Sequence, residues 1–326
     1  MQLFFFFSGY FVPKSFDKKG SVVFLQERIK RLGIPSVVYS FLIGPYVQVG
    51  FAYLFFNKQY WLADKFVSVL PLVMTGVTWF PQTLIIFNLI YAFACKKNWS
   101  PTMKCPTVFG FFLLSLMIGT VTGIINLFLP GDRSFFGASL FGLDYFASIL
   151  FFFGGAIAQR NNWMDDIKEK RSRMAIYSWM ILGFLFVIWN FILFPLLGYP
   201  TAYTDYPSLH LIGYAIFCGP VGMGLSLGVV VFFMDYVNRS YWCTQFFSVS
   251  MYTAYIMQPV VIIITQWIWI LVLQATNNVT IESQMYIYNN GNLILPGFIF
   301  VSMLTLILLW PLSYGIRSIP GFSKVL

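Results

Sequence analysis

The sequence predicts an all-α, polytopic integral membrane protein, a helical bundle with about nine transmembrane segments. Apolar residues make up 59% of the 326-residue chain and charged residues only 10%, whereas a soluble domain carries about 25% charged residues. Aromatic residues reach 21%, which suits lipid-facing helices and the aromatic belts at membrane interfaces. The composition therefore indicates that lipid, rather than water, surrounds most of the folded chain.

The apolar residues fall into segments separated by polar or charged connections. A helix that crosses a bilayer needs about 20 apolar residues. Eight segments approach or exceed this length: 34–56, 79–95, 106–129, 138–157, 174–195, 208–234, 246–272 and 292–315. A ninth, from Met1 to Val12, supplies little more than half a span. No repeat or low-complexity linker interrupts the series, so residues 1–326 are predicted to form a single membrane domain.

The opening half-span has no basic residue in front of it, and its first charge is Lys14. A signal peptide begins with basic residues and ends at a small-residue cleavage site, and the opening stretch has neither. We therefore expect this segment to be a transmembrane helix cut short, preceded in the intact domain by a further helix. The domain would then be N-terminally incomplete.

The Lys and Arg residues behind the net charge of +9 are spread unevenly over the connections between the apolar segments. Seventeen of the 20 Lys and Arg residues lie in alternate connections and in the C-terminal tail, and only Lys58, Lys65 and Arg133 lie in the others. Because positive residues collect on the cytoplasmic side of a membrane, the 14–33 loop and the C-terminus are predicted to be cytoplasmic, with the plasma membrane as the expected location. Topology thus explains the charge, and no nucleic-acid partner is expected. The four cysteines lack the spacing of a metal site.

Three stretches of the chain carry a resemblance to a known family. The first is LFFFFSGYFVPKS followed by FLQERIKRLGIP, the second is GVTWFPQTLIIFNLIY, and the third is SVSMYTAYIMQPVVI. In this order they resemble the type-3 acyltransferase family, polytopic enzymes that acylate sugars and other hydroxyl compounds. The resemblance covers most of the chain. It implies a core of ten helices, one more than the segments found here.

The resemblance also implies roles for particular residues. Arg28 and Arg31 match the family's basic loop and would bind acyl-CoA. Five residues would line the acceptor site: Ser8, Tyr10, Trp79, Tyr255 and Gln258. The implied donor substrate is acyl-CoA, and acetyl-CoA is the expected form of it. No bound cofactor is implied. The other partners are the lipid bilayer and a carbohydrate or lipid-linked hydroxyl acceptor.

The catalytic base of the family has no match in this chain. The family carries an Arg and its presumed catalytic His in the first helix, in front of the residues matched here. The only histidine is His210, and Gln258 stands where many members have a His. Glutamine forms hydrogen bonds but takes up no proton near neutral pH. His210, which also fits an interfacial or capping residue, and Asp144, the one acid inside a predicted span, remain the catalytic candidates.

Each match has a plainer explanation beside the functional one. Arg28 and Arg31, three residues apart, would share a face of a helix and could clasp phosphates, or they could anchor the loop to anionic lipid heads. Trp79 could stack on a sugar ring or belong to an aromatic belt. Ser8 fits helix packing in the membrane better than nucleophilic catalysis, because the sequence offers no base to activate it.

The expected function is transfer of an acyl group from cytosolic acyl-CoA to a hydroxyl of a carbohydrate or lipid-linked acceptor. The expected acyl group is acetyl. Two alternatives stay open. The missing base favours a catalytically degenerate family member with a scaffold or regulatory role. Many spans interrupted by Pro and Gly also suit a transporter or flippase, although charged residues are nearly absent from the spans.

Overall fold

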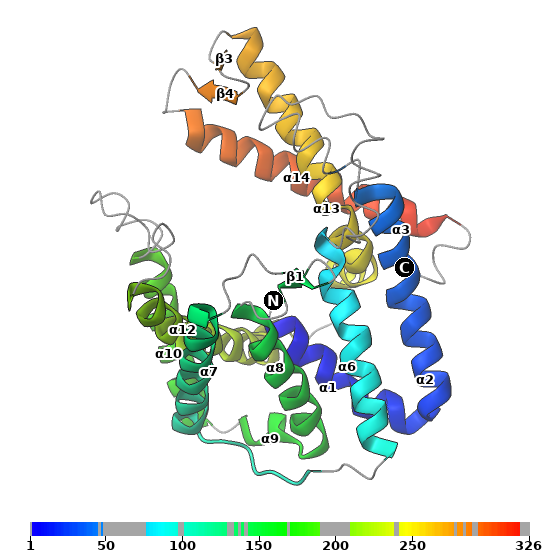
Figure 1. Ribbon diagram of the computed structural model, residues 1–326, viewed down its shortest axis with the longest axis vertical. Coiled ribbons are helices and arrows are strands. Elements are labelled where there is room, and N and C mark those ends of the chain that lie inside the picture. Colours follow the sequence, from blue (N-terminus) through cyan, green and yellow to red (C-terminus); the bar gives the residue numbers. More distant parts are fainter. Residues whose placement is uncertain are drawn as a thin grey trace. The chain divides into compact units, whose positions relative to one another are not determined.

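The computed structural model describes residues 2–44, 47, 76–96, 101–128, 134–135, 138–139, 143–167, 170–189, 209–237, 241–276, 279–282, 285–288 and 293–319. These residues are almost entirely helical, as predicted (Figure 1). The α-helices are α1 (Gln2–Lys19), α2 (Ser21–Arg28), α3 (Ile34–Val38), α6 (Trp79–Lys96), α7 (Val108–Phe128), α8 (Leu143–Arg160), α9 (Trp163–Ile167), α10 (Lys170–Ile188), α12 (Leu209–Phe232), α13 (Trp242–Ala275) and α14 (Ile294–Ser318).

The described strands form two short antiparallel hairpins. Strand β1 (Ser134–Phe135) pairs with β2 (Ala138–Ser139), and β3 (Val279–Glu282) pairs with β4 (Met285–Tyr288). The first hairpin corrects one predicted boundary. Because Ala138 and Ser139 take part in strand pairing, α8 begins only at Leu143 and not at the predicted residue 138.

The length of the helices bears on the predicted spans. Among the described residues, three helices are long and apolar enough to cross a membrane: Ile216–Val237, Thr244–Ala275 and Leu295–Ser318. Three shorter apolar helices cover Val108–Ile124, Phe146–Arg160 and Ser172–Ile188. About half of the predicted span 34–56, residues 45–46 and 48–56, lies outside the described residues. The total of about nine spans stays a prediction.

The basic segment 14–33 is helical, which corrects its prediction as a loop. Helix α1 passes through Pro13 and ends at Lys19. Gly20 then adopts a φ of 74°, a left-handed conformation that glycine reaches without steric penalty. Helix α2 follows at once and continues into a π-helical turn, η1 (Ile29–Gly33), then α3, and then a second π-turn, η2 (Tyr39–Ile43).

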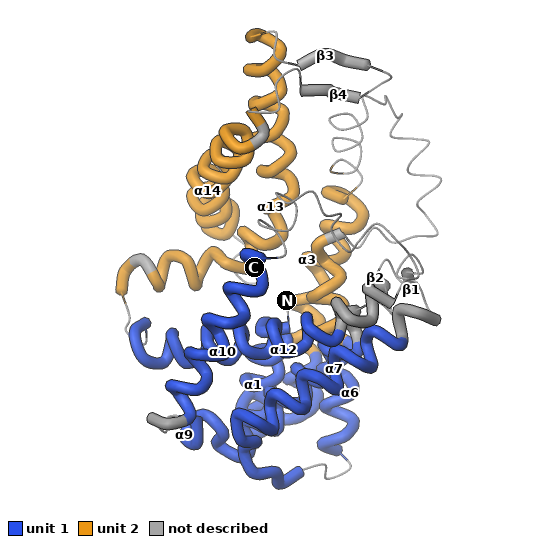
Figure 2. Tube along the Cα trace, turned by 90° about the vertical axis from the view of Figure 1, so that its left-hand side faces the viewer, with its two compact units in different colours: residues 1–25, 86–239 blue, residues 26–85, 240–326 orange. Residues whose placement is uncertain are grey.

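The chain divides into two compact units (Figure 2). Unit 1 contains residues 1–25 and 86–239, and unit 2 contains residues 26–85 and 240–326. Helices α2 and α6 each contribute residues to both units. The single domain over residues 1–326 stays a prediction.

Unit 1 is built on helix pairs that approach each other closely at glycines. A Cβ atom added to Gly9 of α1 would overlap the carbonyl oxygen of Phe152 in α8, and one added to Gly155 of α8 would overlap that of Phe6. Helices α7 and α12 meet in the same way, where Gly219 lies against the backbone of Ser115. Small residues at such crossings let helices associate closely in a membrane.

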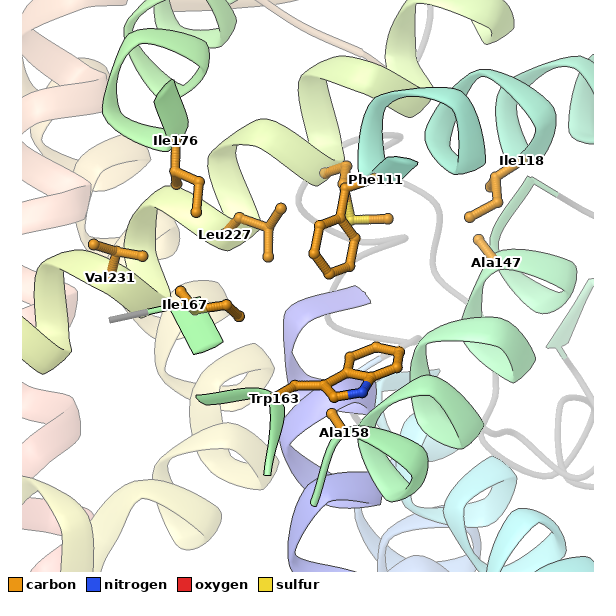
Figure 3. Close-up of a cluster of buried hydrophobic side chains, with 10 residues drawn as sticks. Phe111, Ile118, Ala147, Ala158, Trp163, Ile167, Ile176, Leu227 and Val231 are labelled. Atoms are coloured by element: carbon orange, nitrogen blue, oxygen red, sulfur yellow. The ribbon is translucent and has the colours of Figure 1, made fainter. Parts of the chain in front are cut away.

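The hydrophobic core of unit 1 lies among α7, α8, α9, α10 and α12 (Figure 3). The ring of Trp163 packs edge-on against that of Phe111, with 6.2 Å between their centroids. Further buried members of the core are Ile118, Ala147, Ala158, Ile167, Ile176, Met223, Leu227 and Val231. Apolar contacts with the other helices of unit 1 therefore hold the short helix α9 in place.

Hydrogen bonds and ion pairs tie the helix ends of unit 1. The Arg160 guanidinium at the end of α8 donates to the Tyr91 hydroxyl at 2.9 Å and pairs with the Asp17 carboxylate at 3.2 Å. Helix α8 is thereby joined to α6 and α1. Arg173 of α10 pairs with Asp235 at 2.8 Å, in the π-helical segment η5 (Phe233–Val237) that continues α12.

The segment 101–107 before α7 is held by side chains that follow α8. Asn161 donates to the carbonyl of Pro101 and accepts from the amide of Met103, both at 3.1 Å. The indole nitrogen of Trp163 donates to the Met103 carbonyl at 2.8 Å. These bonds hold Cys105 in a partly buried position beside α9.

We expect the Cys105 thiol to react slowly. Burial, and to a smaller extent the charge of Asp166, raises its pKa from 9.0 to about 11. At pH 8 the higher pKa reduces the fraction of Cys105 present as thiolate about a hundredfold. A more basic thiolate is a stronger nucleophile, which makes each thiolate react about tenfold faster. Alkylation of Cys105 at pH 8, measured by peptide mass spectrometry, should therefore be about tenfold slower than that of a free cysteine peptide. Asn161→Ala should release the segment and restore the rate, and an ordinary rate in the native protein would contradict this explanation.

Unit 2 is organised around α13 and α14, which run antiparallel, side by side (Figure 1). Phe247 near the start of α13 packs on Trp310 near the end of α14, with ring centroids 4.6 Å apart. At the other end of the pair Trp269 packs on Phe300 at 5.2 Å. Between these contacts, the hydroxyls of Thr265 and Thr305 form a buried hydrogen bond of 2.9 Å.

Candidate functional site

Two of the three recognised stretches meet in unit 2 at the carbonyl oxygen of Val77. The Tyr255 hydroxyl of α13 donates a hydrogen bond to this oxygen. The hydroxyl of Tyr39, from η2, also hydrogen-bonds to Val77. The Tyr255 ring packs edge-on against Phe80, with centroids 6.1 Å apart. Segments far apart in the sequence therefore converge on the turn that precedes α6.

The sequence around Val77 explains the local structure. Gly76–Thr78 form a 3-10 turn, η3, and α6 begins at Trp79. The fully buried Thr78 accepts a hydrogen bond from the Gln82 amide at 3.3 Å, and the Thr83 hydroxyl donates to the Trp79 carbonyl at 2.8 Å. These bonds fix the first turn of the helix. The half-buried indole of Trp79 is thereby held at the helix start, beside Phe80.

Helix α13 also buries hydroxyl groups near Tyr255. Within the described part of the chain, the side-chain oxygens of Ser250, Tyr252 and Thr253 are buried without a hydrogen-bond partner, as is that of Ser40 beside Tyr39. A buried polar group without a partner is uncommon in native proteins and calls for an explanation such as a ligand or an ion. These hydroxyls therefore favour a polar occupant in this part of unit 2.

The two basic residues of the first stretch lie in one helical run but differ in exposure. Arg28 ends α2 and is half-buried, whereas Arg31 is exposed in η1. A π-turn rotates Arg31 away from the position that an α-turn would give it. Burial, followed by the charge of Arg31, lowers the pKa of Arg28, and Glu27 opposes this effect. Both guanidiniums stay protonated, so a bound anion would be stabilised by two like charges.

Comparison with known proteins decides the family. A family model described as an acyltransferase domain, of type 3, matches residues 1–314. The chain belongs to the type-3 acyltransferase family. No curated protein and no solved structure matches it. With its apolar helices, the chain is an integral membrane protein of a membrane acyltransferase family.

The acyltransferase motifs are divided between the two units. Trp79, Tyr255, Arg28 and Arg31 belong to unit 2, and so does Gln258, whose side chain is exposed three residues after Tyr255.

Ser8 and Tyr10 belong to α1 of unit 1. Both are half-buried, and Tyr10 packs against Phe11, with ring centroids 5.5 Å apart. Their role as acceptor-site residues stays a prediction.

The candidate base and acid cannot be placed in the same detail. Asp144 lies in the first turn of α8 and His210 in the first turn of α12. Their side chains lie outside the described residues. Their catalytic roles therefore stay predictions, as does the role of Gln258 in place of a histidine.

Two residues of unit 2 were missed by the sequence analysis. Tyr39 is almost fully buried and hydrogen-bonds to the backbone of Val77, the residue whose carbonyl accepts from Tyr255. A tyrosine inside an apolar segment carries a hydroxyl that needs a partner, which is a signal that sequence reasoning could have used. Arg317 near the end of α14 buries its Nε atom without a partner among the described residues. In the sequence, Arg317 is one of the basic residues of the C-terminal tail that predict the topology.

Proposed function

We propose that this acyltransferase moves an acyl group, acetyl in the simplest case, from cytosolic acyl-CoA to a hydroxyl of a carbohydrate or lipid-linked acceptor in the plasma membrane. The family match supports acyl transfer as the class of reaction. The donor, the acyl group and the acceptor are the proposal. The observation that carries the site is the convergence of Tyr39, Val77 and Tyr255 beside Trp79.

The reaction converts the thioester of acyl-CoA into an oxygen ester of the acceptor. The acceptor hydroxyl oxygen attacks the thioester carbonyl carbon, a C–O bond forms, and the C–S bond breaks. The hydroxyl loses its proton, and the departing coenzyme A thiolate takes one up, so atoms and charge balance. A general base that accepts the hydroxyl proton would accelerate the attack.

Trp79 is the proposed contact for the acceptor. Its indole presents a flat apolar face of the kind on which a sugar ring stacks. The buried, unpartnered hydroxyls of α13 are the proposed hydrogen-bond partners of a polyol. The bonds of Tyr39 and Tyr255 to Val77 hold the turn from which Trp79 projects. In this proposal the two tyrosines position the acceptor platform, and Trp79 touches the substrate.

Arg28 and Arg31 are the proposed donor residues. Coenzyme A carries several phosphate groups, and guanidinium groups bind phosphate through paired, charge-assisted hydrogen bonds. The cytoplasmic side predicted for this segment is the side from which acyl-CoA arrives. The half-buried Arg28 would make the stronger contact, because its charge is less screened by solvent than that of the exposed Arg31.

A kinetic comparison tests the proposed acceptor platform. Membranes that contain the chain are supplied with radiolabelled acetyl-CoA and carbohydrate acceptors, and label in extractable ester is counted. For the acceptor that is used, Trp79→Ala should lower kcat/KM about tenfold or more, equivalent to about 1.4 kcal/mol of lost binding. The KM for acetyl-CoA should not change.

The control is Trp242→Ala, which removes an exposed tryptophan of the same unit. Equal losses in the two variants would show that Trp79 acts only as a membrane-interface residue. Absence of labelled ester with every acceptor would overturn the proposed reaction and favour a degenerate family member.

A further inference from the structure

A cavity lies in unit 1, and Trp79, Tyr255, Arg28 and Arg31 are not among the residues that line it. It has a volume of about 160 Å³, lies among α1, α7, α8 and α12, and is partly open at its surface. Its walls are mainly apolar and include Ile118, Ala147, Phe151 and Met223. Figure 3 shows Ile118 and Ala147 on two of the helices that bound it.

One hydroxyl in the cavity wall has no partner. Thr122 of α7 is only 4% exposed, and its Oγ1 atom makes no hydrogen bond within the described part of the chain. The second polar side chain in the wall is Gln2, whose Oε1 atom accepts a hydrogen bond from Ser148 at 3.2 Å. A buried hydroxyl without a partner is unfavourable. It therefore points to an occupant with an oxygen that hydrogen-bonds Thr122.

The size of the cavity argues against water as that occupant. Each water takes about 30 Å³ and needs two to four hydrogen bonds, so about five waters would be required to fill the space. Thr122 and Gln2 cannot satisfy so many. An apolar cavity of about 150 Å³ stays dry and accepts a molecule of the size of benzene. An occupant with an apolar body therefore fits the walls.

We propose that this cavity binds a small neutral molecule with an apolar body of about six carbons and a single hydrogen-bonding oxygen held by Thr122. Aliphatic alcohols and short-chain carbonyl compounds belong to this class. The site does not depend on the proposed acyl transfer. It can be tested in the purified protein without any enzymatic assay.

Gly222 provides a way to fill the cavity. It lines the wall on α12, and a Cβ added there meets no heavy atom within 4 Å, so Gly222→Leu should place its side chain in the empty space. Gly154→Leu is the matched control. Its Cβ also meets nothing within 4 Å, but Gly154 does not line the cavity.

Thermal unfolding with 1-hexanol as the probe is the first test. A ligand that binds only the folded state raises the unfolding temperature by mass action. At one fixed hexanol concentration in detergent, the midpoint shift of the native protein and of Gly154→Leu should exceed that of Gly222→Leu by about 2 °C. Thr122→Val should lose a large part of this excess. Equal shifts in all four proteins would overturn the proposal.

Labelling of Cys218 is the second test, because this thiol also lines the cavity. Methyl methanethiosulfonate modifies thiols, and peptide mass spectrometry separates Cys218 from the other cysteines. Hexanol should slow the modification about fivefold in the native protein and in Gly154→Leu, but less than about twofold in Gly222→Leu. If Gly222→Leu does not fold, Gly222→Ala takes its place with a smaller effect in the same direction. Equal slowing in all proteins would show that hexanol acts through the detergent and would contradict the site.

Discussion

Gly155→Ala should strongly destabilise unit 1. Its new Cβ would overlap the carbonyl oxygen of Phe6 and lie 2.9 Å from the backbone nitrogen of Tyr10. Both neighbours are backbone atoms of α1, so no side-chain rotation relieves the overlap, and α1 and α8 must separate. Overpacking of this kind costs about 3 kcal/mol. We expect a lower unfolding temperature and a smaller yield of monodisperse protein in detergent.

The neighbouring Gly154→Ala is the control for this prediction. It adds the same methyl group to the same helix, with the same gain of about 1 kcal/mol in helix propensity, but no heavy atom lies within 4 Å of its Cβ. The expected difference between the two variants therefore reports the close approach of α1 and α8. Equal unfolding temperatures would contradict the glycine-mediated packing.

Arg28→Ala should have the largest effect on the use of acyl-CoA. Hydrogen bonds to charged groups contribute about 1.5–3 kcal/mol, so the KM for acyl-CoA should rise about tenfold to a hundredfold. Arg28→Lys should recover only part of this loss, because lysine keeps the charge but not the paired geometry. Arg31→Ala should have a smaller effect, since Arg31 is exposed.

Lys30→Ala separates donor binding from membrane anchoring. Lys30 is an exposed residue of the same turn, and its removal takes away the same unit of positive charge. If Arg28 binds the donor, Lys30→Ala should leave the KM for acyl-CoA close to that of the native protein. Equal KM increases in Arg28→Ala and Lys30→Ala would instead assign the basic segment to lipid anchoring and topology.

The helical class could be predicted from composition because, in lipid, few structures other than helices satisfy the hydrogen bonds of the backbone. The boundaries were harder, since local pairing and turns decide them. The β1–β2 hairpin delays the start of α8, and Gly20 breaks a basic segment that is otherwise helical. Neither the π-turn after Arg28 nor its effect on the direction of Arg31 has a signature in hydrophobicity.

The candidate site shows where sequence reasoning ends. The motifs around Trp79 and Tyr255 were found, but their meeting at Val77 depends on tertiary packing across 178 positions of sequence. Tyr39 was missed because its role follows from that meeting and not from its neighbours in the chain. The unpartnered hydroxyl of Thr122 was equally hidden, since a threonine in an apolar segment is ordinary until the cavity beside it is known.

Measuring both products of the proposed reaction together tests acyl transfer most directly. Membranes that contain the chain are incubated with labelled acetyl-CoA and a carbohydrate or lipid-linked acceptor, and free coenzyme A thiol and labelled ester are followed over time. Acyl transfer predicts one thiol for each ester, with both rates falling in parallel in Arg28→Ala and Trp79→Ala at subsaturating substrate. Thiol release without ester would indicate hydrolysis of the donor. Absence of both products, in membranes where the folded chain is present, would contradict the proposed acyltransferase activity.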